Sequence, residues 1–213
     1  RSPLAIISSF ASFLTDENMI VTEEMQSKYL QIIRDRSNFG LDLLNDILDF
    51  SKIESGKINL NLQKLDFISF VHRIIEFNQV LAQGKNQKIF FQSNVEKLML
   101  TFDSFKMEQV INNLLSNAMK FSPENTEINL NIEQTTERLY FSVIDSGPGV
   151  QVSEIEIIFK PFHTSSAQPT NNEKSTGLGL AISRKIIEAH HGEIGVKANA
   201  EKGAVFYFIL PLQ

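Results

Sequence analysis

No proline interrupts the sequence from Glu23 to Ser55, and Gly40 is the only glycine in that segment. Its apolar residues recur every three or four positions, which places them along one face of a helix. They include Leu30, Ile33, Leu41, Leu44, Ile47, Leu48 and Ile53. We therefore predict a single helix of roughly 33 residues and about 50 Å. A helix of that length cannot bury its whole apolar face in a small core, so another surface must cover it.

A shorter helix is predicted near the amino end, where apolar residues also follow helical spacing. These are Leu4, Ile7, Phe10, Ala11 and Leu14. A polar turn near residues 15–21 joins the two helices, and Gly56 is typical of a helix end. Two antiparallel helices leave an apolar stripe uncovered. We expect a second copy of the chain to cover it in a four-helix bundle, which makes the protein a homodimer.

After Gly56 the pattern changes from helical spacing to alternation, which indicates strands. Strands are predicted at 58–62, 88–95, 98–102, 127–134, 138–145, 193–198 and 204–210. Helices are predicted at 67–82 after the N-cap residue Asp66, at 104–121 after Asp103 or Ser104, and at 180–189. This order gives an α/β sandwich with helices on one sheet face. The fold class is therefore α+β, with a helical domain at 1–56 and an α/β domain at 57–213.

The composition narrows the class of protein. A net charge of −5 without a basic segment gives no reason to expect nucleic acid or an anionic membrane as a partner. Without cysteine there is no disulfide, no thiolate metal site and no cysteine nucleophile. No apolar run reaches the ~20 residues of a membrane span. These features fit a cytoplasmic fragment. The start at Arg1 suggests a longer parent, which absent upstream segments could anchor in the inner membrane.

Two asparagines and a lysine follow one another along the predicted helix at 104–121. Asn113 and Asn117 are four residues apart and share a face, and Lys120 with Phe121 follows one turn later. A solvated polar face would explain one asparagine. Two at this spacing favour another role, because an amide oxygen can join a magnesium shell built mostly of water and phosphate oxygens. The lysine could neutralise phosphate charge.

Asp145 ends a predicted strand and points to the same face as its core residues Leu139, Phe141 and Val143. A buried carboxylate needs hydrogen-bond donors. One interpretation is an Asx-type turn cap before the Gly147–Gly149 segment. The other is that the carboxylate binds a ligand amino group, such as the exocyclic amine of adenine. Glycines at 147 and 149 would then let a flat base approach the backbone.

The stretch from Thr176 to Leu180 (TGLGL) leads into a helix, although glycine is a poor helix former. The first amides of a helix have no partner inside it, so together with the helix dipole they favour an anion. A tight turn would also explain Gly177 and Gly179. The order of this stretch after the two preceding blocks favours a phosphate site. The polar segment at 165–174 just before it is expected to be a mobile loop, or lid.

These blocks resemble those of a known family. The segments NNLLSNAMKF, DSGPG, IFKPF and TGLGL are similar to the N, G1, F and G2 boxes of sensor histidine kinases, whose catalytic domain has the Bergerat ATP-binding fold. The opening RSPLAII resembles the tail of their H box, and the helical pair followed by ESGK resembles their dimerisation and histidine-phosphotransfer domain. The resemblance covers essentially the whole chain. It implies ATP and Mg²⁺ as ligands and a response-regulator receiver domain as partner.

The resemblance also implies roles for single residues. Asn117 would ligate Mg²⁺, and Asn113 and Lys120 would contact phosphates. Phe121 would lie against the adenine, and Asp145 would bind its amino group. Gly147 and Gly149 would shape the base pocket. Phe159 and Phe162 would anchor the lid. The residues that border the phosphates would be Thr176, Gly177, Leu178, Gly179 and Leu180. Packing in the core is the alternative for both lid phenylalanines.

Two departures from the family pattern matter. The phospho-accepting histidine would lie three residues before Arg1, so it is absent from the sequence. The four histidines present do not stand in an H-box pattern, and we expect surface or packing roles for them: His72, His163, His190 and His191. The second departure is Ser175, which stands where the family commonly has glycine. It could stiffen the lid without abolishing binding.

The implied activity is transfer of the γ-phosphoryl group of ATP to a histidine and on to an aspartate of a response regulator. Related ATPases use a glutamate four residues before the magnesium asparagine to activate water. Asn113 occupies that position and cannot act as a general base, so we expect poor hydrolysis. The alternative is a nucleotide-binding pseudokinase module. A third role, dephosphorylation of the partner, would use Ser2 to position water, although Ser2 could equally be an N-cap before Pro3.

Overall fold

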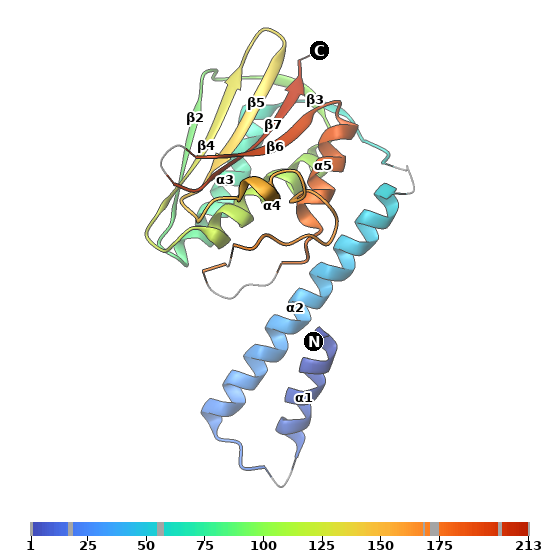
Figure 1. Cartoon of the computed structure of the whole chain (residues 1–213), viewed down its shortest axis with the longest axis vertical. Helices are drawn as coiled ribbons and strands as arrows, with labels where there is room; N and C mark the ends of the chain where they lie inside the picture. Colours follow the sequence, from blue (N-terminus) through green and yellow to red (C-terminus); the bar gives the residue numbers. More distant parts are fainter. Residues whose placement is uncertain are drawn as a thin grey trace. The chain divides into compact units, whose positions relative to one another are not determined.

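The structure is a computed structural model that describes residues 2–16, 19–54, 58–167, 169–170, 175–199 and 202–212 (Figure 1). The chain divides into two compact units, Arg1–Ser51 and Lys52–Gln213, which we describe separately. Several predicted features fall partly outside the described residues. They are the end of the long helix at Ser55 and Gly56, residues 17–18 of the turn, and residues 168 and 171–174 of the lid.

The first unit is a pair of helices, α1 (Pro3–Thr15) and most of α2 (Glu23–Glu54). An aromatic cluster joins them, because the rings of Phe10, Phe13 and Tyr29 have centroids 5.0 to 6.1 Å apart. Both helices were predicted from hydrophobic spacing, and α2 begins at the predicted residue. None of the described helices combines the length and the hydropathy that a bilayer span requires.

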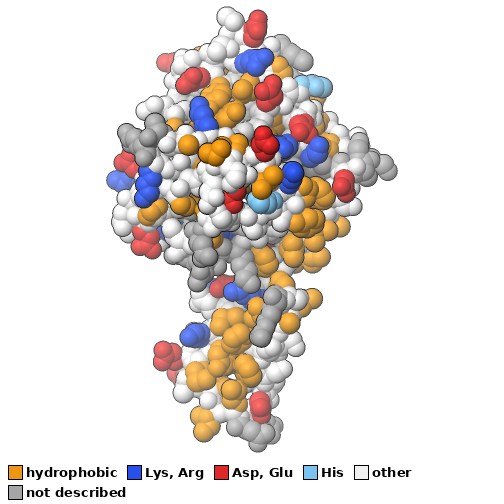
Figure 2. All heavy atoms as spheres, viewed as in Figure 1, with side chains coloured by type: hydrophobic (Ala, Val, Ile, Leu, Met, Phe, Trp, Pro, Cys, Tyr) orange, Lys and Arg blue, Asp and Glu red, His pale blue; other side chains and the backbone are white. Residues whose placement is uncertain are grey.

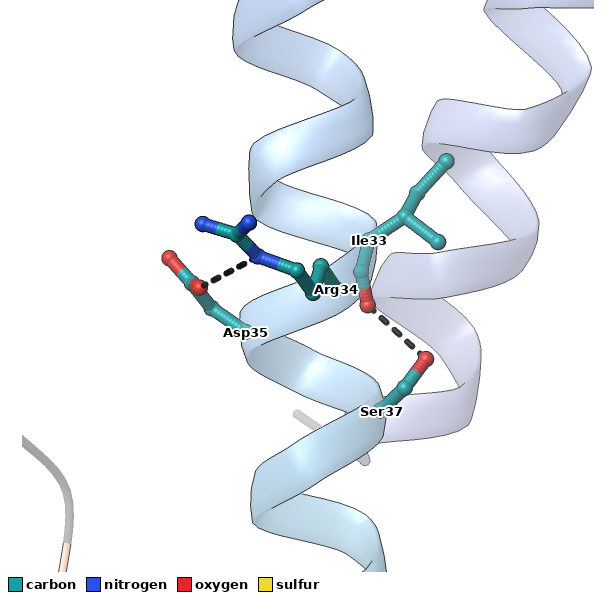
Figure 3. Close-up of polar contacts among 4 residues, drawn as sticks. All are labelled: Ile33, Arg34, Asp35 and Ser37. Atoms are coloured by element: carbon teal, nitrogen blue, oxygen red, sulfur yellow. Dashed lines mark hydrogen bonds and ion pairs between the residues drawn. The ribbon is translucent and has the colours of Figure 1, made fainter.

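The helix α2 turns one side toward α1 and another away from it. Figure 3 shows Ile33 pointing toward α1, whereas Arg34 and Asp35 point away, with Nε and Oδ1 3.9 Å apart. The Ser37 hydroxyl donates to the carbonyl oxygen of Ile33 at 2.8 Å, one turn back in the same helix. An exposed ion pair adds little stability. Both of these polar contacts lie within α2, whereas Ile33 faces α1, where apolar contact stabilises the pair.

Large apolar side chains of α2 remain exposed to between 42% and 59%: Leu30, Leu41, Leu44, Ile47 and Leu48. The helix α1 has no buried residue. Figure 2 shows hydrophobic side chains gathered along the helical unit. The apolar stripe expected from the sequence is thus present on the single chain, and α1 does not cover it.

The second unit is built on a five-stranded sheet with strand order β2-β4-β5-β7-β6. Its strands are β2 (Lys88–Ser93), β4 (Glu127–Gln134), β5 (Arg138–Ile144), β6 (Glu193–Ala198) and β7 (Ala204–Pro211). β2 and β4 are parallel, and the other neighbours are antiparallel. The predicted β4-β5 and β6-β7 hairpins are confirmed. A separate antiparallel pair joins β1 (Gln63–Asp66) to β3 (Met99–Phe102).

Three helices pack on one side of this sheet, α3 (Phe67–Gln83), α4 (Ser104–Phe121) and α5 (Gly179–Ala189) (Figure 1). Alternate strand residues point toward them and are buried. Phe141 and Phe208, cross-strand partners on β5 and β7, stack with ring centroids 4.5 Å apart. The predicted α/β sandwich is therefore confirmed.

Carboxylates begin two of these helices, as predicted. The Asp66 side chain accepts a hydrogen bond from the Ile68 N–H at 3.3 Å at the start of α3. At the start of α4, Oδ1 of Asp103 accepts from the Lys106 N–H at 3.0 Å. Each bond satisfies a backbone donor that has no partner inside its helix.

The strand predicted at 58–62 is wrong, because the structure begins β1 at Gln63. The partner strand β3 reaches only from Met99 to Phe102, where Phe102 pairs with Gln63. Beyond Phe102 the chain turns into α4, and the backbone N–H of Asn61 donates instead to Oδ2 of Asp103 at 2.8 Å. Alternation in the sequence therefore did not show how far the partner strand extends.

Candidate active site

The helix α4 buries one face and presents polar residues on another. The buried face consists of Met107, Val110, Ile111, Leu114, Leu115 and Ala118. Asn113, Asn117 and Lys120 are half-buried. Their spacing places them in a row along one side of the helix, at the edge of the core.

Asn113 joins α4 to the first turns of α5. Its Nδ2 donates to the Ser183 hydroxyl at 2.9 Å. A Cβ atom at Gly179 would overlap Oδ1 of Asn113, so only glycine leaves room for that amide. The sequence showed both Asn113 and Gly179, but Ser183 was missed because it looked like an ordinary residue of a predicted helix.

Asn117 lies one turn after Asn113 and has no hydrogen-bond partner among the residues that the structure describes. Within the described ranges, no three His, Asp or Glu side chains gather as a metal-binding group. A cation here would therefore combine one amide oxygen with oxygens of a ligand and water. Mg²⁺ favours that kind of mixed coordination shell.

Lys120 lies at the carboxyl end of α4 and faces the segment that leads into α5. Its Nζ donates to the Ser175 hydroxyl at 3.0 Å. Ser175, which stands where the family commonly has glycine, thus contacts Lys120, which is predicted to contact phosphate. Phe121 follows and is half-buried.

Asp145, directly after β5, is a carboxylate with only 5% exposure. Its Oδ1 accepts from the N–H groups of Gly147 at 2.8 Å and Ala204 at 3.1 Å. Burial raises the pKa of Asp145, and the two hydrogen bonds oppose that shift. The bond to Gly147 is the Asx-type turn considered from the sequence. Oδ2 has no partner in the described part of the chain, so it is left for a ligand donor.

Glycines let the backbone close around Asp145. A Cβ at Gly147 would lie 2.9 Å from Oδ1 of Asp145 and 3.0 Å from the Phe121 carbonyl oxygen. Gly149 and Gly203 have φ values of +81° and +97°, where other residues are strained. A Cβ at Gly203 would also overlap the Asp145 carbonyl. Gly203 was missed from the sequence, because only the β5-β7 pairing brings it to this place.

The start of α5 has the geometry of an anion site. The Thr176 hydroxyl accepts from the Leu178 N–H at 3.2 Å, and Gly177 adopts a φ of +73°. The N-cap residue Leu178 makes no side-chain capping hydrogen bond. The N–H groups of Gly179 and Leu180 have no acceptor among the described residues, and they point out of the first turn. The tight turn and the free amides are therefore both present.

The two lid phenylalanines lie in different environments. Phe159 is 3% exposed, and the Arg184 guanidinium lies 4.5 Å from its ring centroid. Phe162 is 64% exposed, with a φ of +60°. A Cβ at Gly177 would lie 2.9 Å from the Phe162 carbonyl carbon, so this turn packs on the TGLGL segment. Core packing describes Phe159 but not Phe162.

Ser2 belongs to the helical unit. It occupies the N-cap position of α1 before Pro3, but its side chain makes no capping hydrogen bond. Its side chain is exposed.

His190 has a packing role, as expected. Its Nε2 accepts from the Asp103 N–H at 3.1 Å, and Nδ1 lies 2.8 Å from the Ile186 carbonyl oxygen, to which it donates in the neutral form. Burial lowers the pKa of this imidazole. His190 thereby ties the end of α5 to the start of α4.

Together these features fit a purine triphosphate with a cation. Asp145 offers an unpaired carboxylate oxygen beside a glycine-lined backbone, and Asn117 offers an unpaired amide. The α5 amides and the Lys120 ammonium offer positive electrostatic potential nearby.

Comparison with known proteins agrees with this geometry. Residues 102–213 match the family of histidine kinase-, DNA gyrase B- and HSP90-like ATPases, and residues 1–56 match the His kinase A phospho-acceptor domain. The chain belongs to the histidine kinases. It contains both parts of a histidine kinase core, in the order that the sequence predicted.

Curated relatives of this kinase core include the sensor protein kinase WalK of Staphylococcus aureus, 30% identical over 216 residues and all of the chain. The chain spans 51% of that relative and 35% of the WalK from strain JH9, which is also 30% identical. The chain thus spans about a third to a half of the length of these curated relatives.

Solved structures show the same architecture. The histidine kinase ThkA in complex with the response regulator protein TrrA has a TM-score of 0.82 and 28% identity, over all of this chain and 58% of that one. Full-length ShkA in complex with AMPPNP has a TM-score of 0.75 and 27% identity, over all of this chain and 46% of that one. The Acinetobacter baumannii histidine kinase AdeS, at 22% identity and a TM-score of 0.76 over all of this chain and 96% of its own, supports the fold.

Proposed function

We propose that this kinase core binds ATP with Mg²⁺ and, within a longer protein, phosphorylates a histidine. The phosphoryl group then passes to an aspartate of a response-regulator receiver domain. The observation that carries the proposal is the carboxylate of Asp145, whose Oδ1 is held by the N–H groups of Gly147 and Ala204 while Oδ2 has no partner among the described residues. The AMPPNP complex of ShkA supports the nucleotide, and the TrrA complex of ThkA supports the partner.

Different residues of the site contact different parts of the nucleotide. Oδ2 of Asp145 accepts from the adenine amino group, and Phe121 borders the base. Asn117 holds Mg²⁺, while Lys120 and the first amides of α5 face the phosphates. Magnesium, when bound, neutralises phosphate charge and orients the transferred group.

Asn113 favours transfer over hydrolysis. Its amide is not a base, and its Nδ2 is engaged by Ser183, so it cannot deprotonate water. The site therefore holds the γ-phosphate for a nucleophile from elsewhere. In the H-box pattern that nucleophile is a histidine three residues before Arg1.

The helical pair supplies the dimer interface in this proposal. Its exposed leucines on α2, among them Leu44 and Leu48, pack against a second copy in a four-helix bundle. Residues 1–56 then form the dimerisation and phosphotransfer domain, and residues 57–213 the catalytic domain. We place this core in the cytoplasm, where ATP and response regulators are available.

The activity is tested by extending the chain upstream through the H box and adding γ-labelled ATP. We expect an acid-labile label that disappears in the Asn117→Asp variant. The Asp42→Asn variant, altered on the exposed surface of α2, should keep it. Nucleotide binding without any acid-labile label would overturn the kinase proposal in favour of a pseudokinase module.

We propose phosphatase activity toward the phosphorylated partner as a second activity. It is supported by the exposed side chain of Ser2, whose hydroxyl makes no capping hydrogen bond to α1. Ser2→Ala should lower the rate of partner dephosphorylation while leaving ATP affinity unchanged. An unchanged dephosphorylation rate would remove Ser2 from the mechanism.

A further inference from the structure

Side chains from outside α4 hold its carboxyl end. Nζ of Lys85 donates to the Met119 carbonyl at 3.1 Å. Nε2 of Gln87 donates to the carbonyls of Met119, Ser122 and Pro123 at 3.0 to 3.1 Å. The last carbonyls of a helix have no partner inside it, and a cation there also interacts favourably with the helix dipole. The turn between α3 and β2 thus grips the end of α4.

Thr170 completes this group. Its N–H donates to the Lys120 carbonyl at 3.2 Å, and its hydroxyl lies 3.1 Å from the same oxygen. Nζ of Lys85 donates to the Thr170 hydroxyl at 3.2 Å. Lys85 therefore contacts the helix end directly and again through Thr170.

The gripped end carries two residues of the nucleotide site. Lys120 and Phe121 are the last residues of α4. The next residue, Ser122, is fully buried, and its hydroxyl accepts from the Ser146 N–H at 3.2 Å in the loop after Asp145. A shift of the helix end would therefore move the phosphate and the adenine contacts together.

Burial makes the contacts of Lys85 and Gln87 with the end of α4 rigid. Gln87 is 1% exposed, and its Nε2 is shared among three carbonyls, so a rotation of the amide would break three short contacts in a buried place. Lys85 is half-buried, although most lysines are exposed. Neither residue lies in any of the four boxes, and neither is among the residues that the family resemblance assigns to the nucleotide.

We propose that Lys85, Gln87 and Thr170 are positioning residues of the nucleotide site, which act on ATP through Lys120 and Phe121. The inference rests on the proposed function, because only a bound nucleotide gives these two residues a ligand. The inference adds to the proposed function that the α3-β2 turn and Thr170 hold the end of α4 in position.

The test is calorimetric titration of the whole chain with Mg²⁺ and AMPPNP, well below the thermal midpoint of each variant. Lys85→Met keeps the aliphatic stem, removes the ammonium and should weaken binding roughly tenfold. Lys85→Arg should recover most of the affinity, because a guanidinium can still donate to both oxygens. Lys88→Met, at an exposed position that begins β2, is the matched control and should bind like wild type.

Thr170→Val tests the indirect contact and should weaken binding roughly threefold. The double variant with Lys85→Met should bind more tightly than the product of the two single losses predicts, because both changes remove the Lys85–Thr170 hydrogen bond. Losses that simply multiply would remove Thr170 from the group.

A purely structural role predicts a lower thermal midpoint with unchanged affinity of the folded chain. Affinities of Lys85→Met and Thr170→Val within about twofold of wild type would overturn the proposal while leaving the proposed function intact. Failure of the wild-type chain to bind AMPPNP would overturn both.

Discussion

At Asp145 one carboxylate oxygen serves the fold, and the other is available to a ligand. Two backbone N–H groups occupy Oδ1, and burial raises the pKa of Asp145. Keeping an ionised carboxylate at 5% exposure costs folding free energy. A buried carboxylate with a raised pKa and one oxygen unpaired among the described residues favours a binding role.

Replacing Asp145 by asparagine should separate the two roles. The variant keeps an oxygen for the backbone donors, so its midpoint at pH 7 should equal or exceed that of wild type. Its amide NH₂ would face the adenine amine, so ATP affinity should fall at least about tenfold. Thermal unfolding and calorimetric titration measure the two effects, with Asp42→Asn as the control.

The pH dependence follows from the direction of the shift. The folded state holds the Asp145 proton more tightly than the unfolded state, so wild type loses stability relative to the asparagine variant as pH rises from the ordinary carboxyl pKa of 3.8. A variant that is less stable at pH 7 than at pH 3, relative to wild type, would contradict this account.

His190 predicts the opposite sign. Burial lowers its folded-state pKa below the ordinary 6.5, with Asp103 opposing and His191 reinforcing the shift. The unfolded state therefore binds the proton first as pH falls. The stabilisation is complete above about pH 6.5 and is lost as pH falls through the unfolded pKa toward the folded one.

Urea unfolding at pH 7.5 and 5.5 tests this prediction. His190→Gln should cost about 1–3 kcal/mol at the higher pH, because buried hydrogen bonds are lost. The stability difference between wild type and variant should shrink at the lower pH. An equal difference at both pH values would show that His190 does not titrate in this way.

At the scale of elements, local signals placed the helices well. Asp66 and Asp103 are N-caps in the structure, and hydrophobic spacing identified α1 and α2. The strand at 58–62 failed because strand length depends on a distant partner, which local alternation does not report.

In the site, too, local sequence signals identified some residues and missed those that depend on distant parts of the chain. Asn117 and Asp145 could be recognised in the sequence. Two asparagines four residues apart are unusual on a helix, and a carboxylate that faces the core is unusual at the end of a strand. Gly203 and Lys85 could not be recognised, because each acts on a residue far away in the sequence. Pairing of β7 with β5, and packing of the α3-β2 turn, bring them into place.

Two helix glycines should respond oppositely to alanine. At Gly179 the methyl group would overlap the Asn113 amide, so the variant should lose about 1–3 kcal/mol of stability. At Gly40 the nearest atom is Pro3 Cβ at 4.0 Å, so alanine should add about 0.5–1 kcal/mol through helix propensity. Chemical denaturation of both variants checks this, and equal effects would contradict the packing at Gly179.

At the scale of the whole molecule, the chain combines a well-packed α/β unit with a helical unit whose apolar stripe is exposed. Burying several half-exposed leucines against a second copy would gain roughly 1 kcal/mol or more per side chain. Association is therefore the expected source of stability for the helical pair.

Sedimentation equilibrium tests the dimer. Wild type should have a mass of about 48 kDa, twice the 24.1 kDa of one chain. Leu44→Asp combined with Leu48→Asp should sediment as a monomer, because two carboxylates would be buried in the interface. Val152→Asp, at an 86% exposed site of the other unit, should remain dimeric. A monomeric wild type would contradict the bundle.

The central claim is that Asp145, Asn117 and the start of α5 form one Mg²⁺-dependent nucleotide site. Calorimetric titration of the whole chain with AMPPNP tests it most directly, with Mg²⁺ and again with EDTA. We predict one AMPPNP per chain in Mg²⁺, and binding at least about tenfold weaker in EDTA or with Asn117→Asp. No binding by wild type, or equal affinity in all three titrations, would contradict it.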